Sequence, residues 1–241
     1  MAYRKPSLIA SRSITYMQIP SNLLGAAAKI TPEQMAFMVR HTSGIVCTPI
    51  TAEDAKRLKL DPMVALNDAP MGTAFTVTID YKEGLTTGIS AKERAATCHA
   101  LANRNVVADD FVRPGHIFPL RAREGGVLKR AGHTEAGCDL ATLAGLSPAS
   151  VICEIMSEDG SMARLPELRE FAAKHGLKIG TIADLIHYRS QTESSAFYLL
   201  SFARKNELFT DSPQLKLART PQQAGGMRGL KNWALHNFSL S

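Results

Sequence analysis

The sequence predicts an α/β fold, a three-layer α/β/α sandwich around a mixed sheet. From about residue 25 to 190, helix-like and strand-like segments alternate at short intervals, which is typical of helices packed on both faces of a sheet. The chain has 241 residues, 45% of them hydrophobic, enough for the core of one main domain with tails. No window approaches the roughly 18 consecutive apolar residues that a membrane span needs.

The first half of this region contains two capped helices and two strands. Thr31–Gln34 reads as a capping box with proline at the first helical position, and apolar residues follow it at helical spacing. A strand is expected at Gly44–Cys47 and a second at Phe75–Asp80, where apolar and polar residues alternate. Another capped helix is expected from Ser90 to about Leu101.

The second half continues the alternation. The apolar run Val151–Met156 predicts a buried strand, and Pro166–His175 predicts a helix that ends at Gly176. A further helix is expected near Ile182–Arg189. Beyond it the pattern is broken, although Phe197–Phe209 could form a helix.

Charge and cysteine usage bound the partners and the compartment. The net charge of +6 and pI near 9.2 indicate an anionic partner. Aromatic residues make up only 6% and the basic residues are scattered, so a phosphorylated small substrate explains the charge at least as well as nucleic acid. The four cysteines form no CxxC pair, which favours a reducing, cytoplasmic setting without disulfides.

The stretch Arg130–Leu140 is the most informative for chemistry. A glycine-containing turn enters a helix there, flanked by an arginine and a threonine. Free backbone N–H groups and the positive end of the helix dipole make such a turn a phosphate site in principle. From local chemistry alone, a plain helix cap at Thr134 is the commoner explanation.

Three side chains are suited to proton transfer or metal ligation: His116, His133 and Glu154. A carboxylate inside an apolar strand is costly to bury unpaired, so Glu154 is expected to meet a cation or to act in the chemistry. His116 alone could equally be structural. Cys47, within an apolar segment, is more often a packed thiol than a nucleophile.

Four segments together resemble the 3,4-dihydroxy-2-butanone 4-phosphate synthase family of riboflavin biosynthesis, in family order and spacing: Thr87–Ser90, Arg113–Leu120, Arg130–Ala136 and Ile152–Ile155. The similarity covers about residues 23–192, which divides the chain into a divergent N-terminal segment (1–22), a synthase-like domain (23–192) and a basic tail (193–241). Several motifs in register make chance similarity a poor explanation.

The resemblance implies a specific reaction. The family converts D-ribulose 5-phosphate to L-3,4-dihydroxy-2-butanone 4-phosphate and formate, using Mg²⁺ (or Mn²⁺) at an active site on a homodimer interface. It implies that His116 and Glu154 are catalytic and that His133 is a metal ligand. The substrate would be held by a set that includes the glycine turn and Glu154: Arg130, Ala131, Gly132, His133, Thr134, Glu154 and Asn22. Enediol chemistry needs such acid, base and cationic groups around one sugar phosphate.

The sequence departs from the family just upstream of Leu23. There the family carries an Arg-Glu-Asp/Asn-Glu-Gly-Asp run, whose first glutamate binds magnesium and whose arginine and aspartate contact substrate. Counting back without a gap, Gln18 stands at the metal-binding glutamate, Asn22 at the aspartate and Met17 at the arginine. Because magnesium prefers anionic oxygen ligands, Gln18 is expected to be a weakened metal ligand.

Two functions of different classes follow. The first is an active synthase, favoured by the presence of His116, His133 and Glu154. The second is a catalytically impaired homologue that binds a sugar phosphate or partners an active paralogue, favoured by the loss of the acidic run. Nucleic-acid or membrane binding has no support from motifs.

Overall fold

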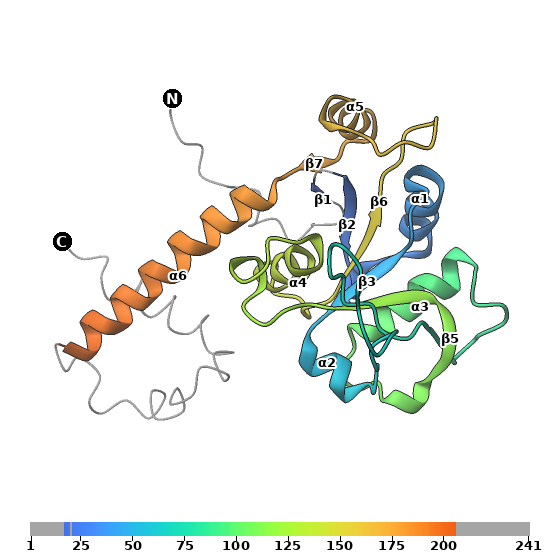
Figure 1. Ribbon diagram of the computed structural model, residues 1–241, viewed down its shortest axis with the longest axis horizontal. Helices are drawn as coiled ribbons and strands as arrows, with labels where there is room; N and C mark the ends of the chain where they lie inside the picture. The colour runs from blue at the N-terminus through green and yellow to red at the C-terminus, as the bar shows by residue number, and fades with distance from the viewer. Residues whose placement is uncertain (1–16, 20, 206–241) are drawn as a thin grey trace. The chain divides into compact units, whose positions relative to one another are not determined.

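In the computed structural model, the structure describes residues 17–19 and 21–205, and side chains from residue 21 to 193 (Figure 1). The chain divides into two compact units, Met1–Ser190 and Gln191–Ser241. The fold described below is that of the first unit. It contains the entire sheet and all of the predicted site residues.

The sheet is mixed and has seven strands in the order β4-β5-β3-β6-β2-β1-β7. Two neighbouring pairs, β3 with β5 and β1 with β7, are parallel, and the others are antiparallel. The strand bounds are β1 Met17–Ile19, β2 Asn22–Ala26, β3 Cys47–Ile50, β4 Ile79–Tyr81, β5 Phe111–Arg121, β6 Ser150–Glu154 and β7 Lys178–Ile179.

Six α-helices connect or flank these strands: α1 Pro32–Thr42, α2 Ala52–Arg57, α3 Ala91–Leu101, α4 His133–Leu143, α5 Leu165–His175 and α6 Ile182–Lys205. Three short 3-10 helices lie at Ala27–Lys29, Ala108–Asp110 and Gly126–Leu128. Within the described part of the chain, no helix is both long and apolar enough to cross a membrane.

Two hydrophobic cores lie on opposite faces of the sheet, because side chains alternate along each strand. Leu23 of β2 and Cys153 of β6 belong to the core that contains residues of α1 and α3. Their neighbours Leu24 and Ile152 belong to the core that contains residues of α4. Figure 1 shows α1 and α4 on either side of β2 and β6. The predicted three-layer α/β/α sandwich is therefore confirmed.

The predicted helix ends are largely confirmed. Thr31 and Gln34 form the expected reciprocal capping box at the start of α1, and Ser90 caps α3 in the same way with Glu93. Helix α5 ends at Gly176, whose φ of 64° is left-handed, a conformation that glycine adopts at little cost. These signals are local, so they could be read from the sequence alone.

Strand bounds were predicted less well. The strand expected at 44–47 lies at Cys47–Ile50 and contains Pro49, a residue that is unusual in a central strand because it cannot donate a backbone hydrogen bond. The strand expected at 75–80 is reduced to Ile79–Tyr81, and the one at 151–156 lies at Ser150–Glu154. Helix α6 continues to Lys205, beyond the predicted Arg189. The remainder of the predicted tail helix, up to Phe209, lies outside the described residues.

No strand was expected around His116, but this residue lies within the longest of the described strands, β5. The pairing of β4 with β5 shifts register between Ile79, which pairs with Ile117, and Asp80, which pairs with Val112. Residues 113–116 of β5 therefore bulge at this step. His116, at the end of the bulge, thereby lies beside Asp80 of β4, which is 36 positions away in sequence.

Candidate active site

One row of side chains crosses the middle of the sheet on the α4 side. Phe118 of β5 pairs with Cys47 of β3, Cys47 pairs with Ile152 of β6, and Ile152 pairs with Leu24 of β2. All four side chains belong to, or pack against, the core under α4. From this row, the polar residues nearer one end of the sheet can be placed by counting two positions along each strand.

The next row contains three of the predicted site residues. His116 is two positions before Phe118, Glu154 is two positions after Ile152, and Asn22 is two positions before Leu24 and pairs directly with Glu154. Since side chains two apart in a regular strand share a face, Asn22 and Glu154 lie on the α4 side at one end of the sheet. His116, the last residue of the bulge, lies at the same end of β5. The strands β5 and β6 are separated only by β3, so their backbones are roughly 10 Å apart.

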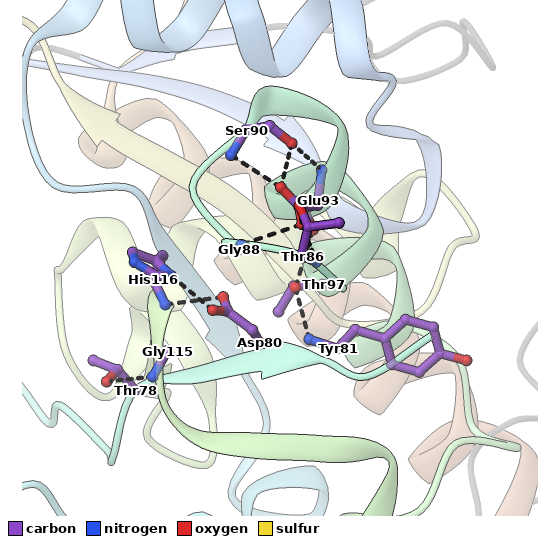
Figure 2. Close-up of polar contacts among 10 residues, drawn as sticks. All are labelled: Thr78, Asp80, Tyr81, Thr86, Gly88, Ser90, Glu93, Thr97, Gly115 and His116. Atoms are coloured by element: carbon purple, nitrogen blue, oxygen red, sulfur yellow. Dashed lines mark hydrogen bonds and ion pairs between the residues drawn. The ribbon is translucent and has the colours of Figure 1, made fainter. Parts of the chain in front are cut away.

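His116 is held by a buried carboxylate that the sequence interpretation did not single out (Figure 2). One oxygen of Asp80, Oδ1, accepts the backbone N–H of His116 at 2.9 Å, and Oδ2 lies 2.7 Å from the ring Nδ1. Asp80 is only 3% exposed, whereas the His116 side chain is 41% exposed. The carboxylate thus fixes a ring that still faces solvent. The argument that drew attention to Glu154, an acid within an apolar strand, applies equally to Asp80.

The loop of residues 86–90, called the glycine loop below, lies against Asp80 and His116. A Cβ added to Gly88 would come within 2.1 Å of Asp80 Oδ2 and 2.7 Å of His116 Nδ1, and the φ of Gly88 is +80°. Both the space and the backbone conformation therefore require glycine. Gly115 is constrained in a similar way, because its Cβ would lie 2.0 Å from the backbone of Ile79.

Glu93 in the first turn of α3 anchors that loop (Figure 2). Its Oε1 accepts N–H bonds from Thr86 at 2.6 Å and Gly88 at 3.2 Å, and its Oε2 accepts the Ser90 hydroxyl at 2.6 Å. Hydrogen bonds from Ser90 and then Thr86 lower the pKa of Glu93 to about 2. Thr97 joins the same helix to β4, since its hydroxyl accepts the N–H of Tyr81 at 3.0 Å.

At the Asn22 end of the row, a buried polar atom lacks a hydrogen-bond partner. Asn22 is 4% exposed, and its Oδ1 is buried with no hydrogen-bond partner among the described residues. A buried polar atom without a partner is uncommon and costly. Beside it, Gly44 approaches Glu154 so closely that a Cβ there would lie 2.8 Å from Oε2. The pair of Asn22 and Glu154 thus forms a tight, polar end of the sheet.

This end does not complete a metal site by itself. In the described ranges, no group of three or more His, Cys, Asp or Glu side chains could hold a metal ion. Magnesium takes oxygen ligands, with one or two carboxylates as the usual protein contribution. Asn22 and Glu154 supply one amide and one carboxylate. The backbone of Gln18 lies in β1 opposite Leu23, but its side chain, the predicted ligand, lies outside the described residues.

The glycine turn before α4 is built around an internal ion pair. Arg130 Nη1 lies 2.8 Å from Glu135 Oε2, and its Nη2 donates to the carbonyl oxygen of Met71 at 3.1 Å. A Cβ on Gly132 would lie 2.2 Å from Arg130 Nη1, so a larger residue here would displace the arginine from its ion pair. These bonds use two of the five donors of a guanidinium. Part of the motif that predicts phosphate binding is therefore structural.

The predicted helix cap at Thr134 is wrong. The N-cap of α4 is Gly132, which makes no side-chain cap hydrogen bond, and Thr134 lies inside the helix and is buried. The helix begins two residues earlier than predicted, next to the ion pair between Arg130 and Glu135. His133 and Ala131 flank this start, His133 half-buried and Ala131 exposed. The first-turn N–H groups thus lack a side-chain cap from the N-cap position, which suits an anion.

Cys47 is a packed thiol, as predicted. Burial, and then the neighbouring Glu154 carboxylate, raise the pKa of Cys47 well above its ordinary value. His41 and His175 also have structural surroundings, because their rings lie 4.9 Å apart and both contact Phe37 and Phe171 between α1 and α5. Burial lowers the pKa of His175. These side chains do not belong to the row formed by His116, Glu154 and Asn22, called the polar row below.

A sequence profile of the 3,4-dihydroxy-2-butanone 4-phosphate synthase family matches residues 19–188. The chain belongs to this family. It is 60% identical over 168 residues to the 3,4-dihydroxy-2-butanone 4-phosphate synthase of Pseudomonas aeruginosa, covering 70% of this chain and 46% of that protein. It is also 60% identical over 174 residues to a probable bifunctional riboflavin biosynthesis protein, chloroplastic, of rice (Oryza sativa subsp. japonica), covering 71% of this chain and 32% of that one.

Solved structures of family members have the same fold. A synthase in complex with two magnesium ions is 42% identical, with a TM-score of 0.74 over 78% of this chain and 97% of that chain. The synthase of Candida albicans is 47% identical, with a TM-score of 0.71 over 76% of this chain and 94% of that chain. The chain thus spans about half or less of the curated relatives above, but nearly all of these solved synthase chains.

Proposed function

We propose that this member of the synthase family converts D-ribulose 5-phosphate to L-3,4-dihydroxy-2-butanone 4-phosphate and formate. The five carbons of the substrate are divided between a four-carbon product and a one-carbon acid. The observation that supports the proposal best is the row of His116, Glu154 and Asn22 at one end of the sheet. In that row the two predicted catalytic side chains are separated by only one strand.

His116 and Glu154 are the proposed proton-transfer groups. Forming an enediol requires one group to take a proton from carbon and another to supply a proton to oxygen. The ring of His116 is anchored by Asp80 through Nδ1, so its Nε2 is available for this exchange. Glu154, at the opposite end of the row, is proposed to bind a substrate hydroxyl and to move the second proton. The two groups are proposed to act on opposite sides of the bound sugar.

The phosphate is proposed to bind at the start of α4. Arg130, Ala131, Gly132, His133 and Thr134 surround this helix N-terminus, where backbone N–H groups and the helix dipole favour an anion. Arg130 would supply its remaining donors while keeping its bond to Glu135. Asn22 is proposed as a further substrate contact, since its buried Oδ1 lacks a partner among the described residues. Convergence of the α4 turn on the polar row stays a prediction.

The metal dependence is proposed to be Mg²⁺ or Mn²⁺, bound more weakly than by a site with two carboxylates. A related synthase binds two magnesium ions. In this chain the proposed ligands are His133 and Gln18, and a neutral set of this kind holds a hard cation poorly. The two proton transfers proposed above are assigned to His116 and Glu154 and not to the metal.

A homodimer is proposed from an exposed apolar segment. Leu66 is 82% exposed and Met71 76% exposed, and Met63 and Val64 of the same segment are also exposed. Exposed apolar patches commonly mark interaction surfaces. Sedimentation of the protein, with Leu66→Asp as the dissociating variant, tests this assembly. A cytoplasmic location stays a prediction, as do the absence of nucleic-acid and membrane partners.

A second candidate is a catalytically impaired homologue that binds a sugar phosphate or partners an active paralogue. The specific observation that favours it is the position of Asn22, a neutral amide directly opposite Glu154. Residues 17–22 carry no charge at all. Such a chain would bind the phosphate through Arg130 and α4 but would not release formate.

Incubation of the purified protein with ribulose 5-phosphate and magnesium distinguishes the two candidates. The expected result is formate, quantified by NMR, with loss of the signal in His116→Gln. A matched control is His187→Gln, on α6 and outside the polar row. Binding of ribulose 5-phosphate in calorimetry without any formate would favour the impaired homologue. Absence of both would refute the sugar-phosphate assignment.

A further inference from the structure

We propose that Asp80 is a positioning residue that holds His116 as the Nδ1–H tautomer, so that Nε2 carries the lone pair that faces the substrate. The loop of residues 86–90, anchored by Glu93, keeps this arrangement closed. This inference deepens the proposed function and rests on it for the role of His116. The tautomer itself can be measured in the protein without any substrate.

The hydrogen-bond geometry determines the tautomer. Asp80 uses Oδ1 for the backbone N–H of His116 at 2.9 Å and Oδ2 for the ring Nδ1 at 2.7 Å. An ionised carboxylate only accepts hydrogen bonds, so Nδ1 must carry the hydrogen. In a neutral ring the other nitrogen, Nε2, then has the free lone pair. One carboxylate thereby fixes both the backbone position and the protonation pattern of His116.

The surroundings leave Asp80 little freedom to choose other partners. It lies in β4, is 3% exposed, and faces the bulge at residues 113–116 of β5. The Thr78 hydroxyl accepts the N–H of Gly115 at 3.1 Å, which holds the bulge on its other side. Figure 2 shows Asp80 between the end of the bulge and the glycine loop.

The glycine loop covers the contact between carboxylate and ring. The backbone of Gly88 is so close that a Cβ would collide with both Asp80 Oδ2 and His116 Nδ1. Glu93 binds the N–H groups of Thr86 and Gly88 and the hydroxyl of Ser90, which fixes the loop in this position. With the backbone of Gly88 against it, the hydrogen bond is partly shielded from water, and a shielded charge-assisted hydrogen bond is stronger than an exposed one.

The test compares the His116 ring in the parent protein and in Asp80→Asn by long-range ¹H–¹⁵N NMR on neutral rings at alkaline pH. In the variant, the amide oxygen is expected to keep the backbone N–H of His116, which turns the NH₂ group toward Nδ1. That nitrogen must then accept, and the ring is expected to switch to the Nε2–H tautomer. The matched control is Asp54→Asn, an equally buried carboxylate paired with Arg57, which should leave the His116 signals unchanged.

Kinetics supply the second readout. Loss of the correct tautomer should lower kcat of Asp80→Asn roughly a hundredfold, the scale of one general acid–base contribution, with KM nearly unchanged. A parent spectrum with Nε2–H would overturn the proposal even if the variant fails to fold. So would an unchanged tautomer, or an unchanged kcat, in a folded variant. If the parent protein releases no formate, the proposed function fails while the tautomer result still stands or falls by itself.

Discussion

The two ends of the polar row differ in how their polar atoms are satisfied. At the His116 end, both oxygens of Asp80 accept hydrogen bonds, and the adjacent loop is tied to both oxygens of Glu93. At the Asn22 end, a buried amide oxygen has no partner in the described part of the chain. Among the described residues, one end has its hydrogen bonds complete, whereas the other has an acceptor that a bound molecule could use.

The difference indicates which parts of the chemistry the chain retains. Glycines at 88 and 115 and the buried Asp80 hold His116 in a single geometry, as a group that transfers protons should be held. At the opposite end, residues 17–22 carry no charge, and the loss of a metal-binding carboxylate there stays a prediction. A partner for the orphaned Asn22 oxygen would contribute roughly 1–3 kcal/mol. We therefore expect changes at the two ends to affect different steps.

The largest effect is expected at Glu154, which contacts the Asn22 end but is proposed to work with His116. Glu154→Gln keeps the size of the side chain and removes its ability to exchange protons. Formate release should fall roughly 10²- to 10⁴-fold, measured at saturating ribulose 5-phosphate. The control is Glu158→Gln, an exposed acid four residues later. Full activity in Glu154→Gln would show that the row is not the catalytic site.

The next effect sharpens the comparison at the His116 end. Gly88→Ala introduces a Cβ that collides with Asp80 and His116, while Gly84→Ala has a similar positive φ, +69° against +80°, with nothing within 4 Å. Both variants should lose about 1 kcal/mol of stability from the strained backbone. Only Gly88→Ala should also lose activity, on the order of a hundredfold, because the ring is displaced. Equal kcat values in the two variants would contradict the role of the loop.

At the Asn22 end, restoring acidity is expected to restore metal binding in part. The double change Gln18→Glu and Asn22→Asp puts carboxylates at the two positions where the family resemblance predicts them, so magnesium affinity and formate release should rise, by about tenfold. Recovery should stay partial, because the family resemblance predicts an arginine where this chain has Met17. A buried carboxylate next to Glu154 should also lower the melting temperature in EDTA and make it rise again with magnesium.

The control for this change is Asn105→Asp, an exposed amide in a loop. Its melting temperature should not respond to magnesium. If the unaltered protein already shows a magnesium-dependent rise in melting temperature, equal to that of the double variant, another residue holds the metal. In that case the interpretation of residues 17–22 as a weakened site is wrong.

The fold and the site could be predicted to different extents. Helix ends were readable because a capping box such as Thr31–Gln34, or a glycine such as Gly176, acts within one turn of the chain. The strand that carries His116 was not recognised, because Pro114 and Gly115 are typical of turns. Only the pairing of β5 with β3 and β4 makes that segment a strand, and pairing depends on residues distant in sequence.

The same limit applies to Asp80. His116 and Glu154 could be found from their motifs, but the contact between Asp80 and His116 spans 36 positions in the chain. No local signal connects the two residues, although an acid next to an apolar strand segment is a general indication of function. At Arg130 the sequence also left out one contact. The motif predicts phosphate binding, which stays a prediction, but it gave no sign that the arginine also pairs with Glu135 five residues later.

The smallest effect is expected at Glu93, which acts on His116 only through the loop. Its pKa, lowered to about 2 by hydrogen bonds from Ser90, Thr86 and Gly88, lies below the ordinary value of 4.5. A depressed pKa means that this contribution to stability is complete above about pH 4.5 and is lost as the pH falls toward 2. The amide signals of Thr86 and Gly88 should therefore keep their hydrogen-bonded shifts at neutral pH and lose them over that acidic range.

Glu93→Gln should show the loosened loop at every pH and lower kcat a few-fold. Glu83→Gln, whose carboxylate contacts only the Tyr81 hydroxyl among the described hydrogen bonds, should change neither. Loop signals in Glu93→Gln that match the parent at neutral pH would show that the loop is held by its own backbone and that Glu93 is not its anchor.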